Sequence, residues 1–276
     1  MKMRSKISEL EKPFICGTLF YGDRKTTMQN MKLAELKGAR AFELNLLPLK
    51  ATDEDLKDIF AFTEYPVFTT FRRKGPTSEG TIVEFKGSEE ERIQRLLDVI
   101  EFGSSGFDME FDTFVSRKVP GTQLTRDEEA IKKQKGAMQR ARDLGGEVMM
   151  SCHVYNRALA ADEAVKIGKE IEERGADLAK IVCQNYSYED MLETFKGIVA
   201  LRRKLKIPFV YFAMGEHSKL TRVVGPMLGS MLVYATVTKI PIDFLWHQPL
   251  IEDMREVFQH VDWSITMEGR GDWTKR

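Results

Sequence analysis

The sequence is poor in cysteine and proline, and it has no long apolar run. Only 3 of its 276 residues are cysteine and 9 are proline. Cys16, Cys152 and Cys183 are odd in number, widely spaced and set in apolar runs, which favours buried thiols over a disulfide framework or a zinc site. No segment approaches the ~18 uninterrupted apolar residues of a membrane span. We therefore expect a folded protein with no disulfide, no bound metal and no transmembrane helix.

Charge of one sign is not in excess either. The 42 lysines and arginines balance 42 aspartates and glutamates. A chain without net positive charge gains little from releasing counterions at a phosphate backbone or an anionic membrane. We therefore expect neither nucleic acid nor a membrane as a partner. The basic residues 1–6 are followed by a polar stretch instead of the apolar core of a secretory signal, which predicts a cytoplasmic protein.

Short β-branched and aromatic runs alternate with longer segments of helical apolar period. The predicted strands cover residues 13–20, 41–47, 67–72, 106–111, 147–154, 177–184, 208–214 and 231–236. The predicted helices cover residues 27–36, 53–62, 88–102, 126–144, 162–174, 188–204, 220–224 and 250–261. Eight strand and helix pairs, with no glycine-rich dinucleotide fingerprint after the first strand, favour an α/β fold of the (β/α)8 TIM barrel type over an open sheet. We expect a single domain over residues 1–276, with about 12 peripheral residues at each end.

Two long polar loops interrupt the alternation. Residues 73–87 are predicted to form a hairpin or lid after the third strand, and residues 117–125 form a similar loop after the fourth. Both loops follow the C-terminal ends of strands, where TIM barrels place their active sites.

Polar side chains gather near these same strand ends. They are Glu43, Asn45, Arg72, Glu110, Asp112, Ser151, His153, Lys180 and Arg222. The sharpest signal is Lys180, because an ammonium group within a buried strand costs several kcal/mol unless it loses its proton or is paired. A neutral amine is the nucleophile that forms an imine with a ketone or aldehyde. The alternative is a lysine that reaches solvent or pairs with a structural carboxylate.

His153 also interrupts an apolar strand, and it is expected to meet the lysine of the neighbouring strand above the barrel. A histidine beside an imine can carry the proton of an elimination or aldol step. A lone histidine in such a strand is more often a buried structural residue, but its combination with Lys180 favours the catalytic role. Arg72 and Arg222 suit a substrate carboxylate, through charged bidentate hydrogen bonds. Structural ion pairs with Glu43 or Glu110 are the alternative. Together these residues predict a small keto-acid substrate.

Six segments, in the same order, resemble type I 3-dehydroquinate dehydratase, a Schiff-base (β/α)8 barrel of the shikimate pathway. They are Phe42-Glu43-Leu44, Phe68-Thr69-Thr70-Phe71-Arg72, Phe107-Asp108-Met109-Glu110, Met150-Ser151-Cys152-His153, residues 176–182 around Lys180, and residues 214–230 around Arg222. The resemblance spans about residues 13–238.

The resemblance implies a water elimination that converts 3-dehydroquinate into 3-dehydroshikimate, with no cofactor and no metal. In that reaction Lys180 forms the imine with the substrate ketone, and His153 is the general acid and base. The candidate substrate-binding residues are Glu43, Asn45, Arg72, Glu110, Arg222 and Gln248.

The sequence departs from the family pattern at three places. Asn45 stands where the family usually has an arginine, and the Glu-Gly pair at residues 79–80 is displaced by an insertion. Residues 239–248 replace the family's Ser-Ala-Pro-Gly-Gln closing loop. We expect Trp246, His247 and Gln248 to close the mouth instead, with weak turnover of 3-dehydroquinate as the result.

Other functions stay open on this sequence. A Schiff-base lyase or class I aldolase for another cyclic or hydroxylated keto acid would keep Lys180 and His153 but differ in the residues that contact hydroxyl groups. A catalytically silent, ligand-sensing relative would be expected to lose the lysine. The oligomeric state is open too, with a homodimer among the alternatives.

Overall fold

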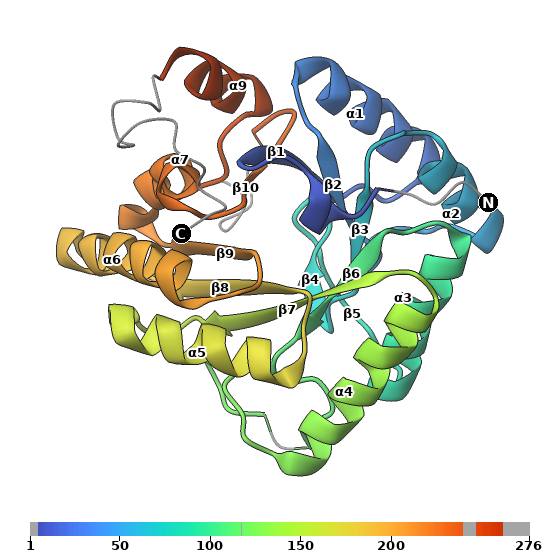
Figure 1. Cartoon of the computed structure of the whole chain (residues 1–276). Coiled ribbons are helices and arrows are strands. Elements are labelled where there is room, and N and C mark those ends of the chain that lie inside the picture. Colours follow the sequence, from blue (N-terminus) through green and yellow to red (C-terminus); the bar gives the residue numbers. More distant parts are fainter. Residues whose placement is uncertain (1–4, 117, 240–246, 262–276) are drawn as a thin grey trace.

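The computed structural model describes residues 5–116, 118–239 and 247–261. Within them, eight parallel strands form one sheet that curls into a barrel, with helices outside it (Figure 1). The strands are β1 (Phe14–Leu19), β2 (Ala41–Asn45), β3 (Val67–Thr70), β6 (Gly106–Glu110), β7 (Glu147–Val154), β8 (Leu178–Gln184), β9 (Phe209–Met214) and β10 (Leu232–Ala235). This architecture confirms the predicted (β/α)8 TIM barrel.

The sheet follows the order β10, β1, β2, β3, β6, β7, β8, β9, and each hydrogen-bonded pair in it is parallel. The first and last strands of this order approach each other through two contacts. The Met231 N–H donates to Phe209 O at 2.8 Å, and the Tyr211 N–H donates to Ser230 Oγ at 3.3 Å. The barrel is therefore nearly closed.

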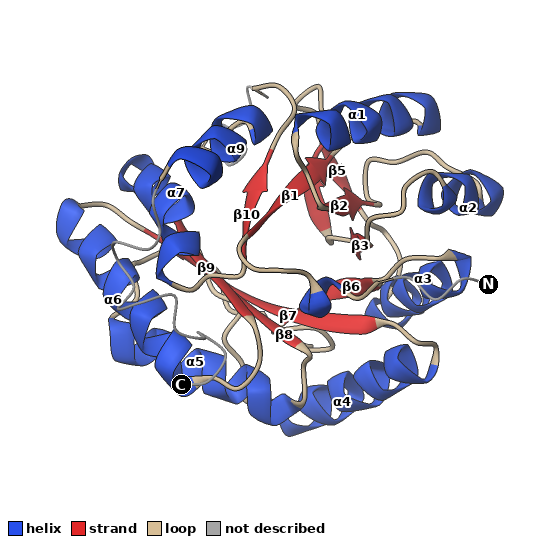
Figure 2. Ribbon diagram, turned by 45° about the horizontal axis from the view of Figure 1, so that its top comes forward, coloured by secondary structure: helices blue, strands red, loops and turns tan. Residues whose placement is uncertain are grey.

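The helices form a ring around the strands (Figure 2). They are α1 (Arg24–Lys37), α2 (Asp53–Ala61), α3 (Glu89–Phe102), α4 (Glu128–Asp143), α5 (Ala161–Arg174), α6 (Tyr188–Lys204), α7 (Lys219–Leu228) and α9 (Ile251–His260), with 3-10 turns η1 (Ile7–Glu9) and η2 (Glu216–Ser218). Local sequence fixes several starts: Thr52 with Asp55, and Ser88 with Glu91, form capping boxes at α2 and α3. Among the described residues, no helix is both long and apolar enough to cross a membrane.

The structure corrects one predicted helix. The segment 220–224 is only part of α7, which continues to Leu228. Gly225 and Pro226 are both poor helix formers, yet they lie inside α7. A Cβ on Gly225 would lie 3.3 Å from Ile198 Cδ1, so the missing side chain lets α7 pack closely on α6.

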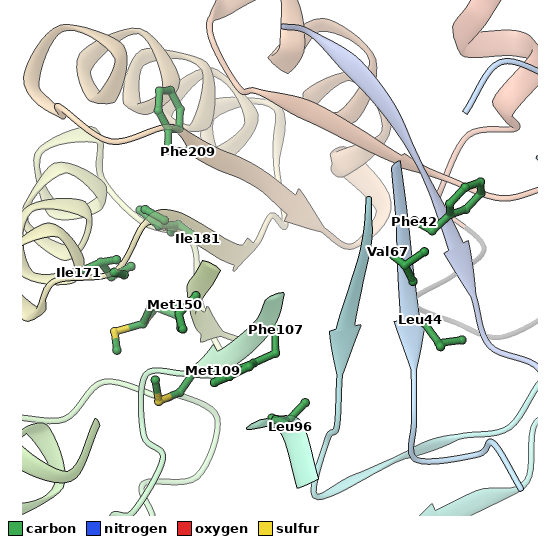
Figure 3. Packing of buried hydrophobic residues seen from close by; sticks show 14 of the residues in the cluster. Phe42, Leu44, Val67, Leu96, Phe107, Met109, Met150, Ile171, Ile181 and Phe209 are labelled. Carbon is green, nitrogen blue, oxygen red and sulfur yellow. The ribbon is translucent and has the colours of Figure 1, made fainter. Parts of the chain in front are cut away.

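Alternate residues of each strand face opposite sides of the barrel wall. Phe42 and Leu44 pack toward the helices in the larger core (Figure 3). Glu43 between them faces the interior, where it contacts Lys180. A smaller apolar cluster fills the N-terminal half of the interior; it includes Ile7, Phe14, Cys16, Phe68, Met149, Leu178, Val210 and Tyr234. Ile7 is 1% exposed, so the segment before β1, expected to be peripheral, contributes to this core. The expectation for the last residues concerns 265–276, which lie outside the described part.

Both predicted loops are positioned at the C-terminal ends of the strands. After β3, strands β4 (Lys74–Pro76) and β5 (Ile82–Glu84) pair antiparallel, which confirms the hairpin expected at residues 73–87. The loop between β6 and α4 is tied to β7 by an isolated antiparallel bridge between Thr122 and Val154. This bridge brings Gln123 to the end of β7.

Candidate active site

A buried lysine lies between two carboxylates inside the barrel. Lys180, on β8, is 4% exposed. Its Nζ donates to Glu43 Oε2 at 3.0 Å and to Asp108 Oδ2 at 3.1 Å. It also lies 4.4 Å from the centre of the Tyr234 ring. The sequence left open whether this lysine is a nucleophile or pairs with a carboxylate; in the structure its amine contacts two carboxylates.

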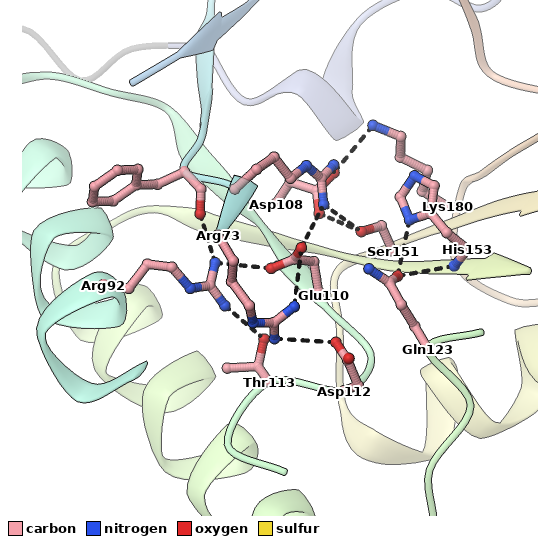
Figure 4. Close-up of polar contacts among 12 residues, drawn as sticks. Arg73, Arg92, Asp108, Glu110, Asp112, Thr113, Gln123, Ser151, His153 and Lys180 are labelled. Carbon is pink, nitrogen blue, oxygen red and sulfur yellow. Dashed lines mark hydrogen bonds and ion pairs between the residues drawn. The ribbon is translucent and has the colours of Figure 1, made fainter. Parts of the chain in front are cut away.

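Asp108, on β6, links the lysine to the next cation (Figure 4). Arg72 Nη2 donates to Asp108 Oδ2 at 2.8 Å, and Ser151 Oγ donates to Asp108 Oδ1 at 2.5 Å. Burial alone would raise the pKa of Asp108, but the positive charges of Arg72 and Lys180 outweigh burial and hold it well below its usual range. Asp108 is therefore an ionised anchor for both cations.

Asp108 was not among the predicted site residues. Its signal was in the sequence, since an acidic residue at an alternate position of an apolar strand faces the same side as Glu110 two residues later.

His153 lies one pleat nearer the C-terminal end of the barrel than Lys180. Lys180 pairs in register with Ser151, and His153 is two residues farther along β7, about 7 Å along the strand. Its ring stacks on Tyr155, with 5.3 Å between ring centres. Burial, together with the positive charges of Arg72 and Lys180, holds the pKa of His153 well below its ordinary value. The imidazole is therefore neutral at neutral pH and able to accept a proton.

Glu110 orients arginines, one of the two roles that the sequence suggested for it. Its carboxylate pairs with Arg92 at 2.9 Å, Arg73 at 3.2 Å and Arg72 at 3.6 Å (Figure 4). Arg92 is completely buried, and it donates to Phe71 O at 2.6 Å. The resulting ion network fixes the backbone next to Arg72 and the direction of its guanidinium group.

Arg222 is a buried cation without a carboxylate partner among the described residues. It lies on α7, 5% exposed, with its guanidinium 4.1 Å from the centre of the Phe212 ring. Burial lowers the pKa of Arg222 to about 9, so the side chain stays charged at neutral pH. The Phe212 and Tyr234 rings meet edge to face at 6.0 Å, and Tyr234 contacts the lysine described above. The Phe212 and Tyr234 rings thus lie between the Lys180 amine and a cation that no described carboxylate neutralises.

Asn45 and Gln248, two of the predicted substrate-binding residues, form their hydrogen bonds apart from the charged residues described above. Asn45 Oδ1 accepts the Leu47 N–H at 3.0 Å and shapes the turn after β2. The backbone oxygen of Gln248 accepts from Lys239 Nζ at 2.9 Å, and its buried side-chain Oε1 has no hydrogen-bond partner among the described residues. Within that same part of the chain, neither side chain forms a hydrogen bond with Lys180. Trp246, another residue of the expected closing segment, lies outside the described residues.

One polar neighbour of the candidate site was missed: Gln123, which binds His153 from the loop after β6. Ser151, which the sequence placed among the polar strand ends, joins Arg72 to the carboxylate of Asp108. The sequence gave no signal for Gln123, because its loop has no regular period from which a direction can be inferred. In the described ranges, no three His, Cys, Asp or Glu side chains are arranged to hold a metal ion.

Comparisons with known proteins agree with this geometry. The family model of type I 3-dehydroquinase matches residues 15–262. A 3-dehydroquinate dehydratase of Methanosarcina mazei is 27% identical over 217 residues, which cover 76% of this chain and 81% of the relative. Another, of Aromatoleum aromaticum, is 27% identical over 132 residues, 48% of this chain; the match spans only half of that relative, 50%.

The fold is similar to that of a solved protein with the same name as these relatives. The 3-dehydroquinate dehydratase of Geobacillus kaustophilus superposes with a TM-score of 0.75 at 18% identity, covering 96% of this chain and 100% of the other. Because the family model covers nearly the whole barrel, the chain belongs to the type I 3-dehydroquinase family.

Proposed function

We propose that this protein dehydrates 3-dehydroquinate to 3-dehydroshikimate through an imine on Lys180. The observation that carries the proposal is the buried Lys180 amine, held by Glu43 and Asp108 at 3.0 and 3.1 Å. Beyond the neighbouring rings lies Arg222, which has no carboxylate partner in the described part of the chain. This arrangement offers a nucleophile for a ketone and a counterion for a carboxylate, the two groups of a keto acid. Family membership and the names of the relatives support the same reaction.

Imine formation begins with the loss of a proton from the Lys180 ammonium group. Glu43 Oε2 and Asp108 Oδ2 are acceptors within hydrogen-bond distance. The freed Nζ lone pair attacks the ketone carbon, and one proton moves from the nitrogen to the oxygen. The carboxylate returns the proton it accepted, the oxygen leaves as water, and an iminium ion remains. A buried carboxylate pair then stabilises this cation as it stabilised the ammonium group.

The elimination step is assigned to His153. Its neutral imidazole takes a proton from the carbon next to the iminium, and the electrons of the C–H bond move onto the iminium nitrogen to give an enamine. When the enamine electrons return, the β-hydroxyl group leaves and takes the proton from the imidazolium as water. Hydrolysis of the new iminium releases the unsaturated ketone and restores the lysine, so the net change is the loss of one water.

Arg222 is the proposed partner of the substrate carboxylate, because its charge is not neutralised by any described acidic residue. Arg72 is committed to Asp108 and Glu110, so it acts mainly on the position of the lysine and secondarily on substrate oxygens. Glu43, which contacts Lys180 Nζ, is the proposed partner of hydroxyl groups near the imine.

A direct assay tests the function. Purified protein is mixed with 3-dehydroquinate, and formation of the conjugated ketone is followed by its ultraviolet absorbance. We expect product at a rate proportional to enzyme. No product from 3-dehydroquinate, together with turnover or borohydride trapping of another hydroxylated keto acid, would favour the lyase or aldolase alternative; no reaction with any of these acids would favour the ligand-sensing one.

The role of Arg222 gives a prediction about binding. Arg222→Met is expected to raise KM for 3-dehydroquinate about 10- to 100-fold, because a charged hydrogen bond to a carboxylate contributes about 1.5–3 kcal/mol. Arg222→Lys should recover part of the loss. Arg203→Met, at an exposed position on α6, is the matched control. The assignment would be contradicted if product, which carries the carboxylate, inhibited the wild type and Arg222→Met equally. An analogue without the carboxylate is the comparison inhibitor.

The side chain of Gln248 is proposed to turn to the substrate, since its buried Oε1 lacks a described partner. Gln248→Ala is expected to raise KM or lower kcat about 3- to 10-fold, the effect of one lost neutral hydrogen bond. Gln94→Ala, on the outer face of α3, removes a comparable amide far from the barrel mouth. Steady-state constants of Gln248→Ala that match the wild type would exclude this contact.

A further inference from the structure

We propose that Gln123 is a positioning residue that fixes the tautomer of His153 and keeps its Nε2 unprotonated for the substrate. Gln123 lies in the loop between β6 and α4 and is 6% exposed. The inference rests on the proposed role of His153 as proton acceptor, but the tautomer itself can be observed without substrate.

The contact between the two residues is built from backbone as well as side chain. Gln123 Oε1 lies 2.9 Å from His153 Nδ1 and also 2.9 Å from the His153 backbone nitrogen. The Gln123 N–H donates to His153 O at 2.9 Å, and the Tyr155 N–H donates to Gly121 O at 2.8 Å. These bonds belong to the bridge between the loop and β7, so Gln123 is held in place independently of its side chain.

The backbone bond identifies the amide atom that faces the imidazole. A backbone N–H only donates, so the atom of Gln123 that meets the His153 nitrogen must be the carbonyl oxygen and not the amide nitrogen. The ordinary ambiguity in the orientation of a glutamine amide is therefore removed. An oxygen that only accepts requires a donor at Nδ1, and a neutral imidazole has a single N–H. The proton lies on Nδ1, and Nε2 retains its lone pair.

The side-chain amide of Gln123 is neutral, whereas an acidic residue at this position would carry a negative charge. The charged groups that act on His153 are Arg72, Lys180 and Asp108, and Tyr155 stacks on its ring. A carboxylate bound to Nδ1 would stabilise the imidazolium ion, whereas an amide fixes the ring without adding charge. Gln123 therefore fixes the orientation and tautomer of a histidine that burial and the two neighbouring cations keep neutral.

Nitrogen NMR of the histidine rings tests the proposal. The chain has only 4 histidines, and a His153→Ala spectrum assigns the signals of His153. In the wild type at neutral pH we expect a protonated Nδ1 and an unprotonated Nε2. In Gln123→Ala we expect a mixture of tautomers and a kcat lower by about 10-fold or more, with KM and borohydride trapping nearly unchanged.

Gln123→Glu keeps the shape of the side chain and adds a negative charge. We expect the titration of His153 and the acid limb of kcat to move to higher pH, with Nδ1 still the protonated nitrogen. Gln139→Ala, on the exposed face of α4, is the matched control, and thermal melting monitors folding of every variant.

A wild-type His153 protonated at Nε2 would overturn the proposal, as would a Gln123→Ala variant with unchanged tautomer and kcat. Failure of the proposed function reads differently: 3-dehydroquinate would not be consumed by the wild type, while the ring signals would still report the tautomer. If the wild type dehydrates 3-dehydroquinate and Gln123→Ala does so at the same rate, only the proposed role of Gln123 is refuted, and the proposed function stands.

Discussion

Replacement of Lys180 by methionine is expected to reduce turnover of 3-dehydroquinate by about 10⁴-fold or more, because the variant has no amine with which to form the imine. Methionine keeps a long, unbranched side chain in the interior. It also leaves Glu43 and Asp108 without their shared cation, so a conformational stability measurement must accompany the kinetics.

Borohydride trapping gives this prediction a readout that does not depend on rate. Reduction in the presence of substrate or product should add the mass of the reduced ligand to Lys180. Trypsin cannot cleave after the modified lysine, so the label is expected in a peptide covering residues 175–196. Lys196→Met removes an exposed lysine that pairs with Glu193 on α6 and serves as control, with its label still on Lys180. Label on a different lysine, or an active Lys180→Met variant, would refute the imine assignment.

Replacement of His153 by alanine is the second large effect. Turnover is expected to fall by about 10²- to 10⁴-fold, the usual contribution of a positioned acid or base. Imine formation should persist, so that borohydride still labels Lys180 in this variant. The two variants therefore separate the two halves of the reaction. Near wild-type turnover in His153→Ala would make this histidine a packing residue.

The pH profile provides a further check on His153. Because its pKa lies below the ordinary value of 6.5, the reactive neutral form persists as the pH falls through 6.5. The acid limb of kcat/KM that belongs to His153 is expected below pH 6.5, since the base is lost only when the pH approaches its depressed pKa. His260→Ala, an exposed change at the end of α9, should leave both rate and profile unchanged. An acid limb above pH 6.5 would contradict the neutral histidine.

The strands show how far local sequence information reaches. The prediction for residues 147–154 coincides with β7, and the others differ by one or two residues at their ends. The strand bounds are predicted this well because a strand buried on both faces needs a continuous run of apolar, β-branched residues, and such a run can be recognised in the sequence. The same requirement made Lys180 and His153 conspicuous, because a charged or polar group in such a run must have a reason to be there.

The hydrogen-bond and ion-pair partners of these side chains could not be predicted from the sequence, because they lie far apart in the chain. Lys180 is separated by 137 residues from Glu43 and by 72 from Asp108, yet both carboxylates touch its amine. Glu110 illustrates the same limit, since the sequence suggested two roles and only the positions of three arginines show that it orients them.

The sequence by itself determined the alternation of strands and helices, the barrel, and the lysine and histidine at its C-terminal end. The tertiary structure decided which charges neutralise one another: Asp108 binds both Arg72 and Lys180, while Arg222 keeps its charge free of any described carboxylate. It also decided that the loop glutamine Gln123 holds His153. The reason is that periodicity and burial are properties of neighbouring residues in the chain, whereas a hydrogen bond or ion pair requires two atoms about 3 Å apart, which only closure of the barrel and its loops brings together.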